Sequence, residues 1–319
     1  MPAQPSKLFI TLTILGGILA VSTSSIFIRF AEEDASSLAI AAYRLTLAIV
    51  ILAPIALTRH WQELKILTRK EILLALLSGF FLALHFATWI SSLKYTSVAS
   101  SVVLVTTTPL WVALLSPLIL REPSGKPVII GMLLTLVGGA IVAISDTCLW
   151  KGGLVCPPFS TFLQGSAFFG DFLALCGAWM AAGYIIIGRR LRAKMTLVPY
   201  IFVVYGMAAL LLLVILIFSG QRAIGFQPIT YGWLLLLAII PQLLGHSTFN
   251  WALGYLPASI VSVTLLGEPI GSTILAYLIL KESPTALKIF GAVLILAGIY
   301  VASIKQDANE LKEAVVSNE

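Results

Sequence analysis

The sequence predicts an all-α polytopic membrane protein whose ten transmembrane helices form two inverted five-helix repeats. Three observations predict it: an apolar composition, ten apolar runs of membrane-spanning length, and a second half that repeats the first. Of the 319 residues, 59% are hydrophobic and 11% are charged, whereas soluble domains carry about a quarter charged residues. This composition excludes a soluble globular protein and a disordered chain, and three cysteines are too few for a disulfide scaffold.

The ten apolar runs are bounded by charges, by Gly and Pro, or by polar clusters. A helix of about 20 apolar residues spans a bilayer, so each run can cross once, and the loops leave no room for a sizeable soluble domain. Lys7 and Ala20-Val21-Ser22 also fit a cleaved signal peptide, but a second copy of this segment inside the chain favours a retained span. The expected spans are residues 8–30, 36–57, 71–93, 97–120, 127–145, 166–190, 199–219, 231–254, 258–280 and 285–304.

The Lys and Arg residues are divided unequally between the two ends of these spans. With the N-terminus in the cytoplasm, thirteen lie on the inner side and six on the outer side. Because cytoplasmic loops carry the excess of positive charge, both termini are predicted in the cytoplasm and the chain in the cell membrane, inner or plasma. The net charge of +6 needs no nucleic acid, whose binding requires a basic face on a folded surface. The outer six are Arg29, Lys94, Lys151, Arg222, Lys281 and Lys288.

The most informative feature is an internal repeat at an offset of 160 residues. Residues 93–144 align with residues 253–304 without a gap, and fifteen of these 52 positions are identical. Shared apolar composition would match Leu and Ile, but it would not also align Tyr95 with Tyr255. Each copy has five spans, an odd number, so the copies enter the membrane from opposite sides. Inverted repeats are typical of transporters that bind substrate at the repeat interface near the midplane.

The repeat also sets the expected domains. Residues 1–147 are the first five-helix repeat and residues 166–306 are the second. Residues 148–165 are expected to form an outer linker loop, and residues 307–319 a cytoplasmic polar tail.

Two matching sets of motifs lie in the last two spans of each copy. The second half carries Leu266-Gly267-Glu268-Pro269, Leu278-Ile279-Leu280-Lys281-Glu282-Ser283-Pro284, Gly291-Ala292 and Ala297-Gly298, and the first half repeats them as Thr107-Thr108-Pro109, Leu120-Arg121-Glu122 and Gly131 to Gly139. In these motifs, and over nearly its whole length, the chain resembles the EamA-type family of the drug/metabolite transporter superfamily. The resemblance implies ten helices around a central cavity, cytoplasmic termini, and export of amino acids or other small metabolites. Family members usually carry a Trp in the first helix of each half; here Leu19 stands opposite Trp179, which weakens any aromatic wall from the first helix.

Glu268 is the first candidate for the site. It lies in the middle of the ninth span, where a charged carboxylate costs at least roughly a few kcal/mol unless it faces a cavity or a partner. Pro269 lacks an N–H and frees the carbonyl of Leu265, so the helix is expected to bend there and line a cavity. Glu268 is therefore expected to bind a substrate ammonium or to carry a coupling proton. The alternative is a packing carboxyl bonded to a neighbouring helix, because the first copy has the uncharged Thr108 at this position.

Further polar groups lie on the third and eighth spans. His246 and Asn250 are four residues apart and share a helix face with Gln242, while His85 and Trp89 have the same spacing. Several polar groups on one stripe of a membrane helix indicate a wet or protein-facing side. His246, Asn250, His85 and Trp89 are therefore expected either to bind substrate or to be hydrogen-bonded core residues. Three His without zinc-like spacing predict no metal site.

The remaining candidates each have two interpretations. Arg44, nine residues into the second span, either holds a substrate carboxylate bidentately, or caps backbone carbonyls or pairs with the outer acidic loop, residues 32–34. Thr107 and Thr108 precede a proline, and their hydroxyls either contact substrate or replace the missing backbone bond. Trp179 and Tyr184 either stack on a substrate or pack within the bundle and its interface belt.

Glycines and cysteines are expected to have structural roles. Gly131 and Gly138, with their copies in the second half, are seven residues apart on one face and predict close helix packing, within the chain or in a dimer. Cys148 and Cys156 lie in the outer loop, either free or bonded in an oxidising compartment. Cys176 lies in a span and is expected to be inert.

No enzyme motif accompanies these groups. HExxH and GxSxG are absent, and Gly125-Lys126 lacks the first Gly and the Ser/Thr of a phosphate loop. The sequence therefore predicts a secondary transporter without a cofactor, exporting amino acids or related amphipathic compounds by alternating access. Proton-coupled drug efflux and nucleotide-sugar-type carriage are the alternatives, because the fold does not set the cargo. Expected partners are a small-molecule substrate, the lipid bilayer and, through Glu268, protons; the chain is either a monomer or a homodimer.

Overall fold

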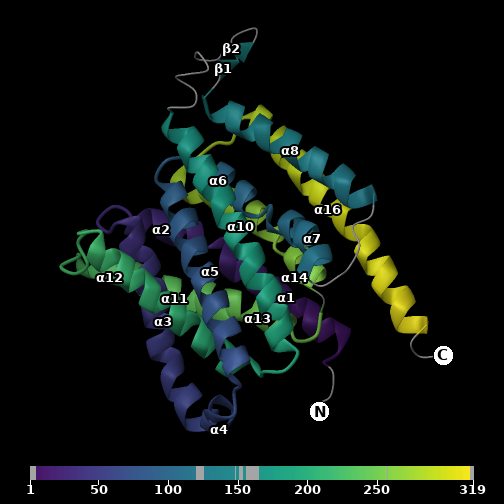
Figure 1. The fold of residues 1–319 in the computed structure, drawn as a ribbon. Coiled ribbons are helices and arrows are strands. Elements are labelled where there is room, and N and C mark those ends of the chain that lie inside the picture. The colour runs from purple at the N-terminus through teal and green to yellow at the C-terminus, as the bar shows by residue number, and fades with distance from the viewer. Residues whose placement is uncertain are drawn as a thin grey trace.

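The computed structural model describes residues 5–119, 126–147, 149–150, 154–155, 165–256 and 258–316. Within these residues the chain is helical apart from an antiparallel hairpin of two-residue strands, β1 (Leu149–Trp150) and β2 (Leu154–Val155). The hairpin lies between two helical halves, at the end of the molecule opposite the start of the first helix and the end of the last (Figure 1). An even number of membrane spans returns the chain to the side where it began, in agreement with this arrangement.

The first half contains eight helices, several of which begin at Ser or Thr caps. Ser6, Ser36 and Ser97 each accept a hydrogen bond from a backbone N–H in the first turn, and Thr68 forms a capping box with Glu71. The helices are α1 (Lys7–Ser22), α2 (Ser24–Ala31), α3 (Ser37–Arg59), α4 (Trp61–Lys65), α5 (Arg69–Leu93), α6 (Val98–Val105), α7 (Thr108–Ile119) and α8 (Lys126–Thr147).

The second half follows the same plan with two π-helical segments in addition. Its helices are α10 (Ser166–Arg192), α11 (Leu197–Phe218), α12 (Pro228–Leu237), α13 (Ser247–Ala252), α14 (Ala258–Thr264), α15 (Gly267–Leu275) and α16 (Ala286–Val316). Two π-helical segments, η1 (Ala238–His246) and η2 (Ala276–Leu280), continue α12 and α15. Helix α16 continues to Val316, so most of the tail expected at residues 307–319 is helical.

Eight helical stretches are long and apolar enough to cross a membrane. Two shorter apolar helices, Ile129–Val142 and Ala286–Val301, occupy the places of the fifth and tenth expected spans. Ten positions along the chain therefore match the ten spans expected from the sequence. The protein is a polytopic, all-α membrane protein built from a duplicated unit.

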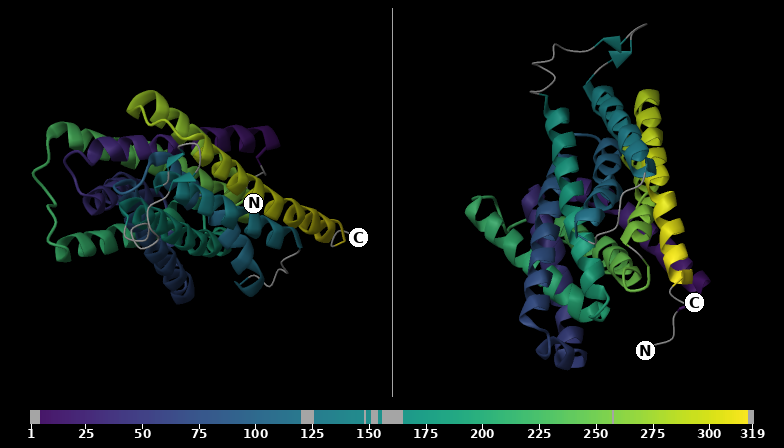
Figure 2. Two further views of the ribbon diagram at one scale, coloured as in Figure 1. Left: turned by 90° about the horizontal axis from the view of Figure 1, so that it is seen from above. Right: turned by 45° about the vertical axis from the view of Figure 1, so that its right-hand side comes forward.

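The packing of α8 against α16 shows how the two copies are related. These helices lie side by side in both views (Figures 1 and 2). A Cβ atom added to Gly138 would lie 2.7 Å from the Gly291 carbonyl oxygen, and one added to Gly298 would lie 2.6 Å from that of Gly131. The two contacts are equivalent under the repeat and lie in an antiparallel pair of helices, as a two-fold axis between inverted copies requires. The glycine faces of α8 and α16 therefore pack against each other within one chain.

Candidate functional site

A cavity with a mixed polar and apolar lining lies among helices of both halves. Its walls come from α5, α6, α7, α10, α14, α15 and the eighth span around η1 and α13. The lining residues are His85, Trp89, Val105, Thr106, Thr108, Ala181, Tyr184, Ile185, His246, Phe249, Asn250, Leu253, Val261, Leu265 and Glu268.

Repeat-equivalent positions face each other across this cavity. Trp89 and Phe249 are 160 residues apart, as are Val105 and Leu265, and all four line it. The third such pair is Thr108 and Glu268. The cavity therefore lies on the interface of the inverted copies, where transporters of this architecture hold substrate.

Both copies break a helix at the cavity wall. The fourth span is interrupted at Thr106 and Thr107, between α6 and α7, and the ninth at Leu265 and Leu266, between α14 and α15. Each break precedes a proline that cannot donate to the carbonyl four residues earlier. The Thr108 hydroxyl donates to the Val105 carbonyl at 2.9 Å, whereas the Glu268 backbone N–H donates to the Leu265 carbonyl at 3.0 Å. Non-helical backbone is tolerated at this depth because it lines a cavity.

Glu268 is 9% exposed and lies in the first turn of α15. Among the described residues its carboxyl group makes no hydrogen bond, so its small exposed surface faces the cavity. Among the described residues that line the cavity, Glu268 is the only carboxylate and none is Lys or Arg, so Glu268 is the strongest site for a cation on this wall. The bend that the sequence predicted beside Pro269 is present as the break before α15.

His85 and His246 meet at the cavity from opposite halves, with ring centroids 6.3 Å apart. The Gly177 carbonyl can only accept, so the His85 Nδ1 at 2.9 Å carries the proton and donates to it. That bond fixes the ring against Trp89, on which it stacks at 5.8 Å. His85 is therefore held in one orientation by α10.

Asn250 is held by two phenols. The Tyr184 hydroxyl donates to its Oδ1 at 2.5 Å, and its Nδ2 donates to the Tyr205 hydroxyl at 3.1 Å. The Tyr205 hydroxyl is also 3.2 Å from the Ser247 hydroxyl. This buried network joins α10, α11 and α13 and orients the polar wall of the cavity.

Arg44 is completely buried and lies behind the cavity wall. Its Nε donates to Gln242 Oε1 at 2.8 Å and its Nη1 to the Ser24 hydroxyl at 2.7 Å, while Nη2 has no partner among the described residues. The guanidinium lies 4.2 Å from the ring centre of Phe86, which in turn contacts His246 at 5.1 Å. Neither a bond to a backbone carbonyl nor a pair with the outer acidic loop is found for Arg44 in the described part of the chain.

Besides Arg44, two of the ten expected site residues, Thr107 and Trp179, do not line this cavity. The Thr107 hydroxyl donates to the Leu104 carbonyl at 2.8 Å and accepts from Trp111 at 3.2 Å. Trp179 is 37% exposed and packs edge-on against Trp111 at 5.3 Å. Leu19, its counterpart in the first copy, is 71% exposed, so neither position of this equivalent pair places an aromatic ring on the wall.

The apolar part of the wall was not expected from the sequence. Phe249, Val105 and Leu265 are the clearest omissions, and the repeat offset contains the signal for them, because Phe249 is equivalent to the expected Trp89. Cys148 and Cys156 lie outside the described residues. Cys176 is a free thiol in α10.

Comparison with known proteins gives one family. The model of the EamA-like transporter family matches residues 8–144 and again residues 168–304. An uncharacterized transporter of Archaeoglobus fulgidus is 24% identical over 296 residues, which cover 89% of this chain and 93% of that protein. The uncharacterized transporter sll1164 of Synechocystis is 27% identical, and the match covers 76% of this chain and 69% of that protein. The uncharacterized transporter YetK of Bacillus subtilis is 24% identical, and the match covers 75% of this chain and 70% of that protein.

A solved crystal structure has the same fold. It superposes with a TM-score of 0.66 at 18% identity, covering 96% of this chain and 100% of the other. At this identity the likeness concerns the fold alone.

Proposed function

This chain belongs to the EamA-like transporter family of the drug/metabolite transporter superfamily, and we propose that it exports amino acids or related amphipathic metabolites by alternating access. The cavity at the repeat interface carries this proposal. It combines one carboxyl group, two imidazoles and an asparagine with apolar and aromatic walls, a mixture that suits a small amphipathic molecule.

Glu268 is assigned the cationic end of the substrate. In this mode the substrate ammonium binds the Glu268 carboxylate, and aromatic walls such as Trp89 and Phe249 contact the side chain. A substrate carboxylate would lie toward Trp89 Nε1, a buried donor of a lining residue without a partner among the described residues. Occupying it would satisfy a group whose burial otherwise costs free energy.

The same carboxyl group supplies a coupling mechanism. Glu268 can hold either a proton or an ammonium group, but not both. If it releases substrate outward and returns with a proton, inward proton flow drives export. Alternating access requires this exchange at a site open to one side at a time.

Amphipathic cations, including drugs, form the second candidate class. The wall offers aromatic rings and one carboxylate and no Lys or Arg, an arrangement that favours cations through both charge and cation–π contacts. A panel of amines beside the matched amino acids separates the two classes.

The test is counterflow in proteoliposomes, with labelled amino acids and amines, with and without a pH gradient. We expect saturable counterflow that a pH gradient drives uphill and that Glu268→Gln uncouples. Glu33→Gln, which removes an exposed carboxylate elsewhere, is the matched control and is expected to leave coupled transport unchanged. Unchanged transport and pH dependence in Glu268→Gln would remove Glu268 from the mechanism, and absence of flux for every amino acid and amine would contradict the substrate class.

A further inference from the structure

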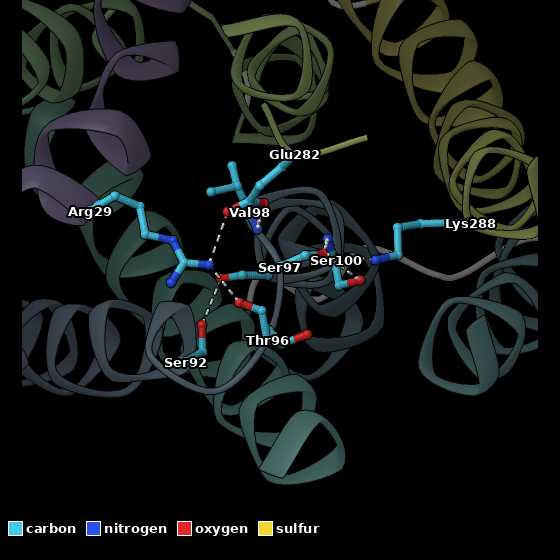
Figure 3. Close-up of polar contacts among 9 residues, drawn as sticks. Arg29, Ser92, Thr96, Ser97, Val98, Ser100, Glu282 and Lys288 are labelled. Carbon is cyan, nitrogen blue, oxygen red and sulfur yellow. Dashed lines mark hydrogen bonds and ion pairs between the residues drawn. The ribbon is translucent and has the colours of Figure 1, made fainter. Parts of the chain in front are cut away.

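A polar cluster joins the two repeats at the end of the bundle predicted to face outward (Figure 3). One Glu282 carboxylate oxygen accepts from Arg29 Nη2 at 3.2 Å, and the other accepts from the Val98 backbone N–H at 2.9 Å. The same Arg29 nitrogen donates to the Thr96 carbonyl at 2.9 Å. Glu282 thus binds a cation on α2 and the first N–H of α6 at once.

A second bond extends the cluster to the tenth span. Lys288 Nζ, on α16, donates to the Ser97 hydroxyl at 2.8 Å, and Ser97 also caps α6 by accepting from the Ser100 N–H. In Figure 3, Arg29 and Lys288 reach the turn before α6 from opposite sides, with Glu282 between them. First-repeat residues are thereby tied to second-repeat residues.

The cluster lies one length of α6 away from the cavity. Val98 and the cavity residue Val105 are at opposite ends of α6, roughly 10 Å apart at 1.5 Å per residue. Between them Ser92 and Ser101 are completely buried, with their hydroxyl oxygens 2.6 Å apart. This contact joins α5 to α6 between the cluster and the cavity.

The opposite end of the bundle has only part of this arrangement. Arg189 is the repeat equivalent of Arg29 and likewise donates to a backbone carbonyl, that of Leu253, at 2.8 Å. In the described part of the chain Arg189 makes no ion pair, whereas Arg29 does. Arg29 thus forms an ion pair between repeats and its counterpart Arg189 does not, while at the opposite end the Glu63 carboxylate accepts from the Thr196 N–H at 2.7 Å and from its hydroxyl at 2.6 Å.

We infer that Arg29, Glu282 and the Val98 N–H form the gate that closes the cavity on this face, and that the gate must separate when the cavity opens there. Its parts are suited to reversible opening. The Arg29 and Glu282 side chains are 24% and 30% exposed, so water can replace each bond at modest cost. The inference rests on alternating access, but on no particular substrate.

Cysteine accessibility tests the gate. In a background with Cys148, Cys156 and Cys176 changed to Ser, a reporter Val105→Cys is labelled with a membrane-impermeant maleimide applied separately to each face of sealed vesicles. Glu282→Gln and Arg29→Gln are each expected to raise the labelling rate about fivefold, because losing a charge-assisted tie shifts the population toward the open state. Glu33→Gln, an exposed carboxylate without a partner among the described residues, is expected to leave the rate unchanged.

A rise confined to one face supports the gate, and that face identifies the compartment; an equal rise from both faces overturns it. An unchanged rate from both faces in both variants, or an equal rise in Glu33→Gln, overturns it. Size-exclusion profiles check that each variant folds. If Glu282→Gln does not fold, Ser97→Ala replaces it, because this change removes the Lys288 contact and the cap of α6. The labelling rate of Val105→Cys is then expected to rise as well. Because labelling needs no transported compound, a failure of the amino-acid proposal leaves this result interpretable.

Discussion

Asp34 joins the turn after α2 to the segment between α11 and α12. Its Oδ2 accepts from the Gln227 backbone N–H at 2.7 Å and from the Thr230 hydroxyl at 3.1 Å, and its other oxygen binds the Arg222 guanidinium. The Gln227 N–H, followed by Arg222, holds the pKa of Asp34 below its usual value of 3.8. The ionised carboxylate therefore stabilises the fold, an effect fully present above pH 3.8 and lost as the pH falls through the lower folded pKa.

At the scale of this residue, Asp34→Asn is expected to lower the melting temperature at pH 7. The difference in melting temperature between the variant and the wild type should narrow as the pH falls below 3.8, because the Asp34 carboxyl of the wild type then becomes protonated and loses its charge. Thermal unfolding in detergent, followed by intrinsic fluorescence across a pH series, measures both. Glu33→Gln should melt with the wild type throughout, and a gap for Asp34→Asn that is the same at pH 7 and at pH 3 would contradict the assignment.

At the scale of elements, the pair of α8 and α16 depends on missing side chains. Each helix approaches the other's backbone so closely that a methyl group at Gly298 would collide with the Gly131 carbonyl and with Thr135. Small residues permit such close approach between membrane helices, where packing replaces the hydrophobic effect as the driving force.

Gly298→Ala is therefore expected to destabilise the protein by about 1–3 kcal/mol through overpacking. Gly16→Ala is the matched control: Gly16 lies in α1 with nothing within 4 Å of an added Cβ, so the helix propensity of Ala should leave stability unchanged or higher by up to about 1 kcal/mol. Unfolding in a graded denaturing detergent compares them. Equal stability of the two variants would show that α8 and α16 are packed less closely than in this structure.

At the scale of the whole molecule, the pseudo-two-fold axis brings Thr108 and Glu268 to one cavity. Each follows a helix break and precedes a proline, so the two positions have equivalent surroundings of opposite orientation. A carboxyl group at either place would face the same space. The site is thus a property of the paired repeats, and neither copy forms it alone.

Moving the carboxyl group from position 268 to the equivalent position 108 tests this symmetry. Glu268→Thr alone is expected to abolish pH-driven uptake, and adding Thr108→Glu should restore part of it, because the carboxyl returns to the cavity from the other half. Combining Glu268→Thr with Thr107→Glu is the control, since Thr107 does not line the cavity. Proteoliposome transport under a pH gradient distinguishes the two double variants. An equal loss of pH-driven uptake in both would mean that the carboxyl group must lie on α15.

Much of the architecture could be predicted from the sequence, and the site only in part. The apolar runs and the repeat located all ten spans, and seven of the ten expected site residues line the cavity. Thr107 and Thr108 show what the sequence leaves open, because Thr108 lines the cavity and Thr107 does not. Adjacent residues on a helix differ by about 100° in direction, so a local pattern cannot say which of the two faces the cavity.

The sequence by itself determined the membrane class, the duplication and its inversion, because apolar length, identity at a fixed offset and an odd span count are local or countable properties. Only the tertiary structure decided which side chains share the cavity, that Arg44 lies behind its wall, and that Arg29 meets Glu282 across 253 residues of chain. These depend on the rotation and closeness of packed helices, which arise from contacts between segments distant in sequence.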